Sequence, residues 1–183
     1  FLKRLIVGGF DRVFEIGRLF RNEGISIKHN PEFTTVEVYQ AYASEKEMIE
    51  LTEKIISKLA IEVRGTTEFE YQGEQISLKA PFKKIEMIDL IKEVTGVDFN
   101  QITSFEDAKA VAKEHGVQLE NHHTSTGYII NEFYEQKCEE TIKNPTFVTG
   151  YPVEVSPLAK AREGSDTLTD RFELFCLGRE YAN

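Results

Sequence analysis

Hydrophobic and polar residues alternate along two segments near the start of the chain. In residues 11–21, Phe14, Ile16 and Phe20 fall at even positions, and a mostly polar set falls between them. Because successive side chains of a strand point to opposite faces, this period of two predicts a β-strand with one buried face. Residues 33–42 have the same strand character and follow a long polar loop. We therefore expect the two segments to form an antiparallel hairpin.

A helical period follows the hairpin. Ser44, a residue type that often begins helices, precedes apolar residues spaced three or four positions apart. These apolar residues are Met48, Leu51, Ile55 and Leu59. Short strand-like runs between 66 and 82 come next, and three more segments then show helical spacing. The three helices are predicted at about 86–95, 104–115 and 126–142.

The strand pattern returns at the end of the chain. Residues 146–148 form a short strand-like run, and residues 171–181 form a longer one that Leu177 and Gly178 interrupt. This interruption predicts a tight turn between two paired strands. Strands at both ends with helices between them predict an α+β fold, in which an antiparallel sheet carries a helical insertion.

The composition supports a folded protein and argues against several other classes. Of the 183 residues, 40% are hydrophobic and 29% are charged, a balance typical of folded rather than disordered chains. The formal net charge of −9 argues against non-specific binding to nucleic acid, which needs clustered Lys and Arg. No apolar run approaches the roughly 20 residues of a membrane span. Cys138 and Cys176 form no Cys-x-x-Cys pair, which argues against a thiolate zinc site.

Residues with useful chemistry are concentrated on the predicted hairpin. Arg21 and Glu23 are two positions apart and share one face of their strand, while Phe33, Glu37 and Tyr39 share a face of the partner strand. If the two faces coincide, one surface offers a guanidinium, two carboxylates, a phenol and an aromatic ring. An Arg fork binds phosphate or carboxylate, and a Phe ring can stack on a base. The alternative is an amphipathic hairpin with a solvated polar face, since surface charge pairs are common.

A second group of candidate residues lies on the last two predicted strands. A tight turn at Leu177 places Phe175 opposite Glu180, and Glu173 then becomes the diagonal neighbour of Glu180 on the same face. Two converging carboxylates suit Mg²⁺, which binds one or two carboxylates together with substrate phosphates and water. The alternative is a pair of surface acids. In this register Asn183 falls on the opposite face unless a bulge intervenes.

Two strings on the predicted hairpin resemble motif 2 of the class II aminoacyl-tRNA synthetases. They are Phe-Arg-Asn-Glu at 20–23 and His-Asn-Pro-Glu-Phe-Thr at 29–34. Their form is similar to that of the lysyl-tRNA synthetases in particular, because aspartyl and asparaginyl relatives lack the second string. Segments 2–10, 151–160 and 170–175 fit the same family, so the resemblance covers the chain from its first residue to its last.

The resemblance implies an ATP site on the hairpin. Arg21 would be the catalytic residue, bridging the α-phosphate of ATP and the carboxylate of lysine. Glu23 and Asn30 would contact the adenine end of ATP, and Phe33 would stack on the adenine ring. His29 would approach the outer phosphates.

The resemblance also implies a lysine pocket and a metal site. Glu37 and Tyr39 would line the pocket that holds the lysine ε-ammonium group. Glu173 and Glu180 would bind Mg²⁺, and Glu173 would also contact ATP. Glu180 and Asn183 would contact lysine.

The implied reaction is the activation of lysine. Attack of the lysine carboxylate on the α-phosphorus of ATP would give lysyl-adenylate and pyrophosphate, and lysine would then pass to tRNA(Lys). The reaction needs no protein nucleophile or general base, because the carboxylate is already ionised near pH 7. The protein would supply positioning and charge stabilisation. The resemblance further implies a homodimeric full-length protein in the cytoplasm, without a membrane partner.

The pattern of the family is incomplete within these 183 residues, since neither motif 1 nor the glycine-rich motif 3 is present. We expect one piece of a catalytic domain, inactive by itself, with a partial antiparallel sheet. Residues 1–85 would hold the motif 2 hairpin, a helix and short strands. Residues from about 86 to 145 would form the helical insertion, and residues 146–183 would return to the sheet.

Two other functions stay open at this point. One is a paralogue that attaches lysine to a translation elongation factor. The other is a synthetase-like module that kept the fold and lost the chemistry. The presence of Arg21, Glu23, Phe33, Glu173 and Glu180 together argues against the second.

Overall fold

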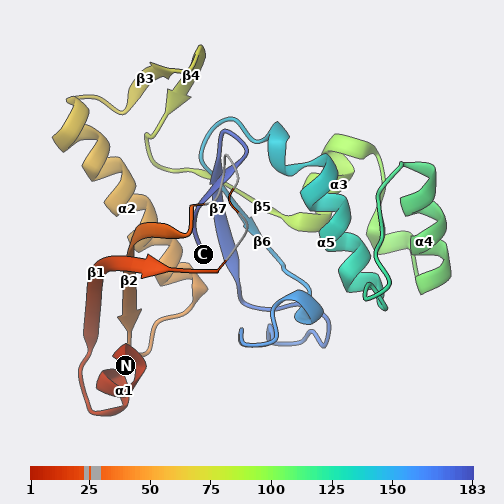
Figure 1. Ribbon diagram of the computed structural model, residues 1–183, viewed down its shortest axis with the longest axis horizontal. Coiled ribbons are helices and arrows are strands. Elements are labelled where there is room, and N and C mark those ends of the chain that lie inside the picture. Colours follow the sequence, from red (N-terminus) through yellow and green to blue (C-terminus); the bar gives the residue numbers. More distant parts are fainter. Residues whose placement is uncertain (23–24, 26–29) are drawn as a thin grey trace. The chain divides into compact units, whose positions relative to one another are not determined.

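The computed structural model describes residues 1–22, 25 and 30–183, and it divides the chain into two compact units, Phe1–Ser44 and Glu45–Asn183. Figure 1 shows the helices and strands of both units in the order of the sequence. The described residues of the first unit form one short helix and two strands. They are α1 (Leu2–Val7), β1 (Arg12–Phe20) and β2 (Glu32–Gln40).

The two strands of the first unit pair antiparallel, which confirms the predicted hairpin. The pairing runs without a shift from Arg12 opposite Gln40 to Phe20 opposite Glu32. The backbone N–H of Arg21 extends the ladder, donating to the carbonyl oxygen of Pro31 at 2.9 Å. Residues of equal parity on β1 and β2 therefore lie on the same face of the hairpin.

The even-numbered face of this hairpin differs from its prediction. Phe14, Ile16 and Phe20 were expected to form a buried face, but their side chains are 70%, 67% and 75% exposed. The physical reason is the size of the unit. Two strands and a six-residue helix cannot supply a second layer that covers this face.

The second unit contains a mixed set of helices and strands. The strands are β3 (Glu68–Tyr71), β4 (Glu74–Ser77), β5 (Lys83–Glu86), β6 (Thr146–Thr149), β7 (Phe172–Cys176) and β8 (Arg179–Ala182). The helices are α2 (Glu45–Arg64), α3 (Met87–Thr95), α4 (Phe105–Glu114) and α5 (Thr126–Lys137). Three short 3₁₀ turns, Phe99–Gln101, Glu139–Thr141 and Val153–Val155, complete the unit. The helix expected over 126–142 therefore ends at Lys137.

Four strands form the main sheet of this unit in the order β5-β6-β7-β8. The pairs β6–β7 and β7–β8 are antiparallel, as predicted, whereas β5 and β6 are parallel. The helices α3, α4 and α5 lie between β5 and β6 in sequence and act as the long connection that a parallel pair requires. The α+β class with a partial antiparallel sheet and a helical insertion is confirmed.

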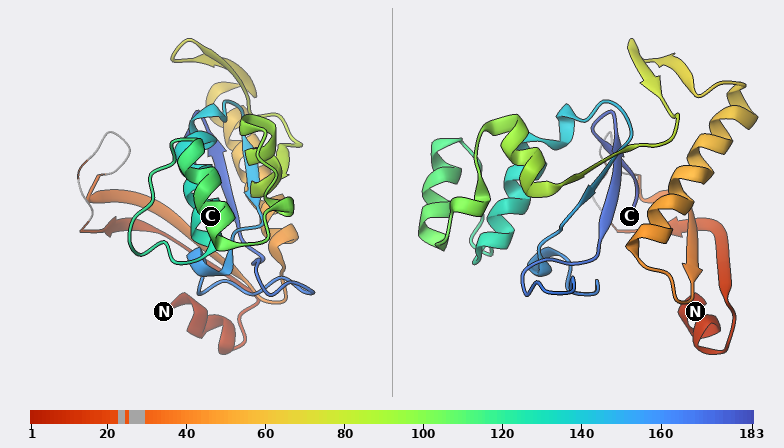
Figure 2. Two further views of the ribbon diagram at one scale, coloured as in Figure 1. Left: turned by 90° about the vertical axis from the view of Figure 1, so that its right-hand side faces the viewer. Right: turned by 180° about the vertical axis from the view of Figure 1, so that it is seen from behind.

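The main sheet separates two hydrophobic clusters, because successive side chains of β6 and β7 point to opposite faces. Phe147, Phe172 and Leu174 pack with residues of α2 on one face. Val148 and Phe175 pack with residues of α3, α4 and α5 on the other. Figure 2 shows α2 on one side of the sheet and the inserted helices on the other. Glu173 lies between Phe172 and Leu174 in sequence and therefore faces the inserted helices.

Candidate functional site

The odd-numbered face of the hairpin brings the predicted ATP residues together. Arg21 and Phe33 share this face, and the guanidinium carbon of Arg21 lies 5.2 Å from the centroid of the Phe33 ring. Such a contact joins a cation to the face of an aromatic ring. The two faces considered in the sequence therefore coincide, with a charged fork beside a flat apolar surface.

Glu37 and Tyr39 occupy the same face nearer to α1. The hydroxyl of Tyr39 donates a hydrogen bond to the Glu37 carboxylate at 3.3 Å. Partial burial, together with the negative charge of Glu37, raises the pKa of the Tyr39 phenol above its ordinary value. The phenol therefore keeps its proton at neutral pH and donates it in a hydrogen bond that orients the Glu37 carboxylate.

Glu15 adds a second carboxylate that was not singled out in the sequence. It lies directly opposite Glu37 in the register of the hairpin, so both side chains project from one face. Like charges directly opposite each other are unfavourable, and a cation bound on this face relieves the repulsion. Glu15 could have been found in the sequence only by aligning the two strands in their register, because that alignment places it opposite Glu37.

Small residues separate the two ends of this face. Gly17 lies opposite Thr35, between the Arg21 end and the Glu37 end. A Cβ atom added at Gly17 would meet only a carboxylate oxygen of Glu15, at 4.0 Å. Among the described residues, the space above Gly17 is therefore not filled by a neighbouring side chain.

The remaining predicted residues of the hairpin are less informative. The side chain of Asn30 accepts a long hydrogen bond of 3.4 Å from the backbone N–H of Glu32. Glu23 and His29 lie outside the described residues. On the even-numbered face, Arg18 pairs with Glu32 at 3.0 Å, with both side chains exposed to solvent.

The second candidate group lies on β7 and β8. Phe175 is opposite Glu180, as predicted, and the ladder then shifts so that Leu174 is opposite Ala182. This irregularity is the bulge that brings Asn183 to the side of Glu173 and Glu180. The Asn183 amide donates to the Glu180 carboxylate at 2.6 Å.

The carboxylate of Glu173 is buried and bonded at both oxygens. The Tyr151 hydroxyl donates to one oxygen at 2.9 Å, and the Arg171 guanidinium donates to the other. Burial and the nearby charge of Glu180 raise the pKa of Glu173 to about 7, although Arg171 and Tyr151 oppose this change. Glu173 and Glu180 lie on the same face of the β7–β8 pair, as the register of these strands predicts.

The donor set of Glu173 and Glu180 fits a magnesium ion that keeps other ligands. Mg²⁺ commonly binds one or two carboxylates and completes its octahedron with water and substrate phosphates. Among residues 1–22, 25 and 30–183, no group of three or more His, Cys, Asp or Glu side chains is arranged to hold a metal ion. The pair therefore suits a metal that arrives with a phosphate ligand rather than one held by protein alone.

Sequence reasoning singled out neither Tyr151 nor Arg171 as a site residue. Arg171 could have been found from its spacing, since it lies two positions before Glu173 and points to the same side of an extended chain. Tyr151 is 22 residues from Glu173, and no local pattern connects the two.

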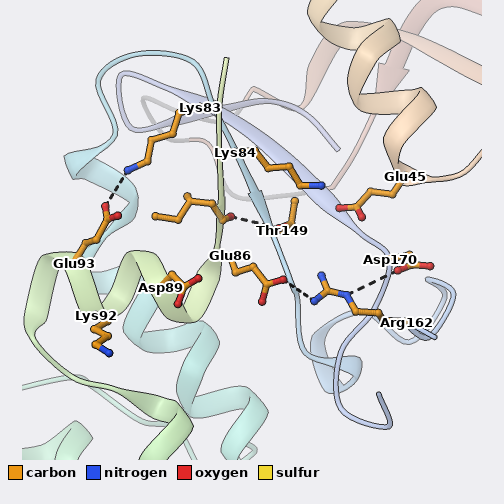
Figure 3. A pocket seen from close by; sticks show the side chains of 11 residues that line it. Glu45, Lys83, Lys84, Glu86, Asp89, Lys92, Glu93, Thr149, Arg162 and Asp170 are labelled. Carbon is orange, nitrogen blue, oxygen red and sulfur yellow. Dashed lines mark hydrogen bonds and ion pairs between the residues drawn. The ribbon is translucent and has the colours of Figure 1, made fainter. Parts of the chain in front are cut away.

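A cavity of about 970 Å³ lies elsewhere in the second unit, between the start of α2, the strands β5 and β6, and the helix α3. Figure 3 shows that charged side chains line it and that many of them are paired. Arg162 bonds Glu86 at 2.7 Å, and Lys83 bonds Glu93 at 2.9 Å. Among the described residues, none of the predicted site residues lines this cavity.

Comparisons with known proteins agree with the resemblance seen in the sequence. The family model described as tRNA synthetases class II (D, K and N) matches residues 1–183. A protein of Fusobacterium nucleatum named lysine–tRNA ligase is 59% identical over 183 residues, which are 100% of this chain and 37% of that protein. Proteins with the same name from Streptococcus gordonii and Bacillus subtilis are 57% and 56% identical over 182 residues. The chain covers 37% and 36% of these two, so it spans little more than a third of such curated relatives.

Within the described part of the chain, no helix combines the length and the apolar character needed to cross a membrane.

Proposed function

Because the chain belongs to the class II tRNA synthetases of the D, K and N group, we propose that it forms part of the catalytic domain of a lysine–tRNA ligase. The complete protein would activate lysine with ATP and transfer it to tRNA(Lys). Identities of 56–59% to proteins named lysine–tRNA ligase, over essentially the whole chain, support lysine as the amino acid.

The observation that carries the proposal is the shared face of Arg21, Phe33, Glu37 and Tyr39 on one hairpin. In this proposal the adenine ring stacks on Phe33, and Arg21 binds the α-phosphate together with the lysine carboxylate. An arginine fork suits this task because its donors match two oxygens at once. Asn30, with Glu23 and His29 of the neighbouring loop, would complete the contacts to ATP.

Glu37 and Tyr39 would hold the ε-ammonium group of lysine. An ammonium group has three donors and one positive charge, so it needs acceptors and compensating negative charge. The Glu37 carboxylate supplies both, and the hydroxyl oxygen of Tyr39 can accept a further hydrogen bond. Glu15, opposite Glu37, increases the negative potential of this end of the face.

Glu173 and Glu180 would hold Mg²⁺, and Glu180 with Asn183 would also contact lysine. When bound, the metal ion supplies charge neutralisation at the phosphate oxygens of ATP. Asn183 already donates to Glu180, which leaves the amide oxygen of Asn183 free to accept from an ammonium group.

With these proposed roles, activation would proceed by a single displacement at the α-phosphorus. The ionised lysine carboxylate forms a bond to the α-phosphorus, and the bond from this phosphorus to the pyrophosphate leaving group breaks. Arg21 stabilises the negative charge that develops on the α-phosphate oxygens. The 3′-terminal ribose hydroxyl of tRNA(Lys) then attacks the acyl carbon, and AMP leaves. A homodimer in the cytoplasm is the assembly that we propose for the complete protein.

The test is the exchange of pyrophosphate into ATP by the complete gene product, measured with lysine, aspartate and asparagine in separate reactions. We expect exchange with lysine and essentially none with the other two, followed by charging of tRNA(Lys). Exchange that depends on aspartate or asparagine would reject the assignment to lysine. Exchange with lysine but transfer to a protein acceptor instead of tRNA would favour the elongation-factor ligase.

A further inference from the structure

Arg171 connects the buried carboxylate of Glu173 to a loop that contains Val155 and Ser156, which lie 16 and 15 positions before Arg171 in the sequence. One terminal nitrogen of the Arg171 guanidinium donates to the carbonyl oxygen of Val155 at 3.1 Å and to the hydroxyl oxygen of Ser156 at 2.9 Å. The other terminal nitrogen donates to Glu173. The planar fork is therefore fixed at both ends, by the loop on one side and the carboxylate on the other.

Tyr151 completes a closed group of three side chains. The guanidinium carbon of Arg171 lies 4.7 Å from the centroid of the Tyr151 ring, and the Tyr151 hydroxyl donates to Glu173 at 2.9 Å. The backbone of Tyr151 is itself anchored, since its carbonyl oxygen accepts bonds from the N–H and the hydroxyl of Thr169, each at 2.9 Å. Tyr151, Thr169 and Glu173 are all buried, so this group is held by packing as well as by hydrogen bonds.

This arrangement restricts the orientation of the Glu173 carboxylate. Each oxygen has one bond to a fixed donor, so the plane of the carboxylate and its remaining lone pairs have a defined direction. Without these donors, a buried carboxylate beside Glu180 would turn away from its neighbour or recruit water. Partners of this kind are known to orient metal-binding carboxylates and histidines in proteins.

We propose that Arg171 is a positioning residue, which holds the Glu173 carboxylate in the orientation in which Glu173 and Glu180 together bind the divalent cation of Mg²⁺–ATP. The proposal rests on the proposed function, since that function supplies the metal and the nucleotide. Arg171 does not contact the substrate itself. Its effect passes through Glu173, with Tyr151 and Ser156 as the groups that keep the guanidinium in place.

Lysine cannot replace arginine in this role. The planar guanidinium donates to two acceptors of the loop and to one carboxylate at the same time, whereas an ammonium group is a point charge on a flexible stem. Arg171→Lys therefore keeps the positive charge but removes the geometry. A loss of function in this variant would indicate positioning rather than charge alone.

Arg162 provides a matched control in the same unit. Its side chain is 25% exposed, compared with 28% for Arg171, and it also forms a short ion pair, with Glu86. Figure 3 shows Arg162 at the charged cavity, with Glu86 and Asp170 as its partners. Arg162→Lys therefore alters an arginine of similar burial that does not contact Glu173.

The experiment measures binding of Mn²⁺ to the complete gene product in the presence of ATP, by electron paramagnetic resonance. We expect Arg171→Lys to weaken Mn²⁺ binding by roughly 10-fold or more, the usual range for the loss of such a partner. Arg162→Lys should bind Mn²⁺ as the wild type does. In lysine-dependent pyrophosphate exchange, Arg171→Lys should need more Mg²⁺ for half-maximal rate, while its KM for lysine stays unchanged.

A folded Arg171→Lys variant with wild-type Mn²⁺ affinity and wild-type Mg²⁺ dependence would overturn the proposal. If Arg171→Lys does not fold, Ser156→Ala and Tyr151→Phe take its place, because each removes one bond of the group and keeps the packing. Wild-type Mn²⁺ affinity in both would equally overturn it. The two proposals can fail separately. If the wild-type protein shows no lysine-dependent exchange, but Arg171→Lys binds Mn²⁺ more weakly than the wild type does, the proposed function fails and the positioning role stands.

Discussion

Arg21 and Phe33 lie side by side on one face of the hairpin, where the guanidinium carbon is 5.2 Å from the centroid of the aromatic ring. The two residues are twelve positions apart in sequence, and they meet because the register of β1 and β2 places both on the odd-numbered face. A charged fork beside an aromatic plane suits a ligand with a phosphate and a base. Substitutions at Phe33 and at Glu37 should therefore affect the binding of different ligands.

Phe33→Leu should weaken the binding of ATP without affecting that of lysine. The leucine side chain keeps an apolar contact but cannot stack on adenine, and stacking of a base on an aromatic side chain contributes about 1–3 kcal/mol. We expect KM for ATP in pyrophosphate exchange to rise by roughly 5- to 100-fold, with KM for lysine little changed. An equal rise in both KM values would show that Phe33 supports the hairpin rather than the base.

Glu37→Gln should weaken the binding of lysine selectively. The amide is similar in size but carries no charge, so the ε-ammonium group loses its main counter-ion. Leaving a charged group without its partner costs about 2–5 kcal/mol, which corresponds to a rise of at least 30-fold in KM for lysine. Glu32→Gln on the opposite face of the same strand is the control, and it should leave both KM values near those of the wild type. A change in KM for ATP alone would contradict the assignment of Glu37.

Gly127 and Glu154 should show strong coupling in stability. The Glu154 carboxylate accepts a hydrogen bond of 2.8 Å from Ser125 at the start of α5. A Cβ atom on Gly127 would lie 2.2 Å from an oxygen of this carboxylate, so Gly127→Ala must displace it. We expect Gly127→Ala to lower the free energy of unfolding by about 1–2 kcal/mol, through the lost hydrogen bond and the lost interaction with the helix N-terminus.

The same substitution in a Glu154→Ala background should be neutral or stabilising, because alanine favours a helix over glycine by about 1 kcal/mol. Denaturant unfolding of the four proteins of this cycle measures the coupling. Additive effects would mean that Gly127 and Glu154 do not interact as described.

Gly178→Ala should destabilise the protein more than Gly164→Ala. Both glycines have positive φ angles, of 63° and 76°, so the backbone strain of an alanine is similar at the two positions. Only at Gly178 would the added Cβ meet another backbone atom closely, at 3.1 Å from the Cα of Glu140. We expect an additional loss of about 1 kcal/mol for Gly178→Ala, in the range typical of overpacking. Equal losses, measured by denaturant unfolding, would show that this close approach can relax.

Local patterns were sufficient to predict the hairpins. The period of two predicted the antiparallel pairing of β1 with β2, and the turn at Leu177 and Gly178 predicted Phe175 opposite Glu180. These features depend on residues close in sequence and on the geometry of a short turn. The need for a bulge before Asn183 was also recognised from the register, and the structure contains one.

Long-range packing could not be predicted in the same way. Of the apolar stripe predicted for α2, which comprised Met48, Leu51, Ile55 and Leu59, Met48 packs against the sheet cluster, where it is joined by Ile49 and Ile56. Apolar residues occur on more than one side of α2, so spacing alone does not select the buried one. Tyr151 was missed for a related reason, because its contact with Glu173 joins residues 22 positions apart and exists only in the folded chain.

The most direct test of the proposed function compares Arg21→Ala with Arg18→Ala in lysine-dependent pyrophosphate exchange by the complete gene product. The two arginines lie on the same hairpin but on opposite faces, and Arg18 forms an exposed ion pair with Glu32. We predict a loss of at least ~10²-fold in exchange rate for Arg21→Ala, because it removes stabilisation of charge in the transition state. Arg18→Ala should remain within about twofold of the wild type, as the loss of an exposed ion pair has little effect. Similar rates for the two variants would contradict the assignment of the odd-numbered face as the site of activation.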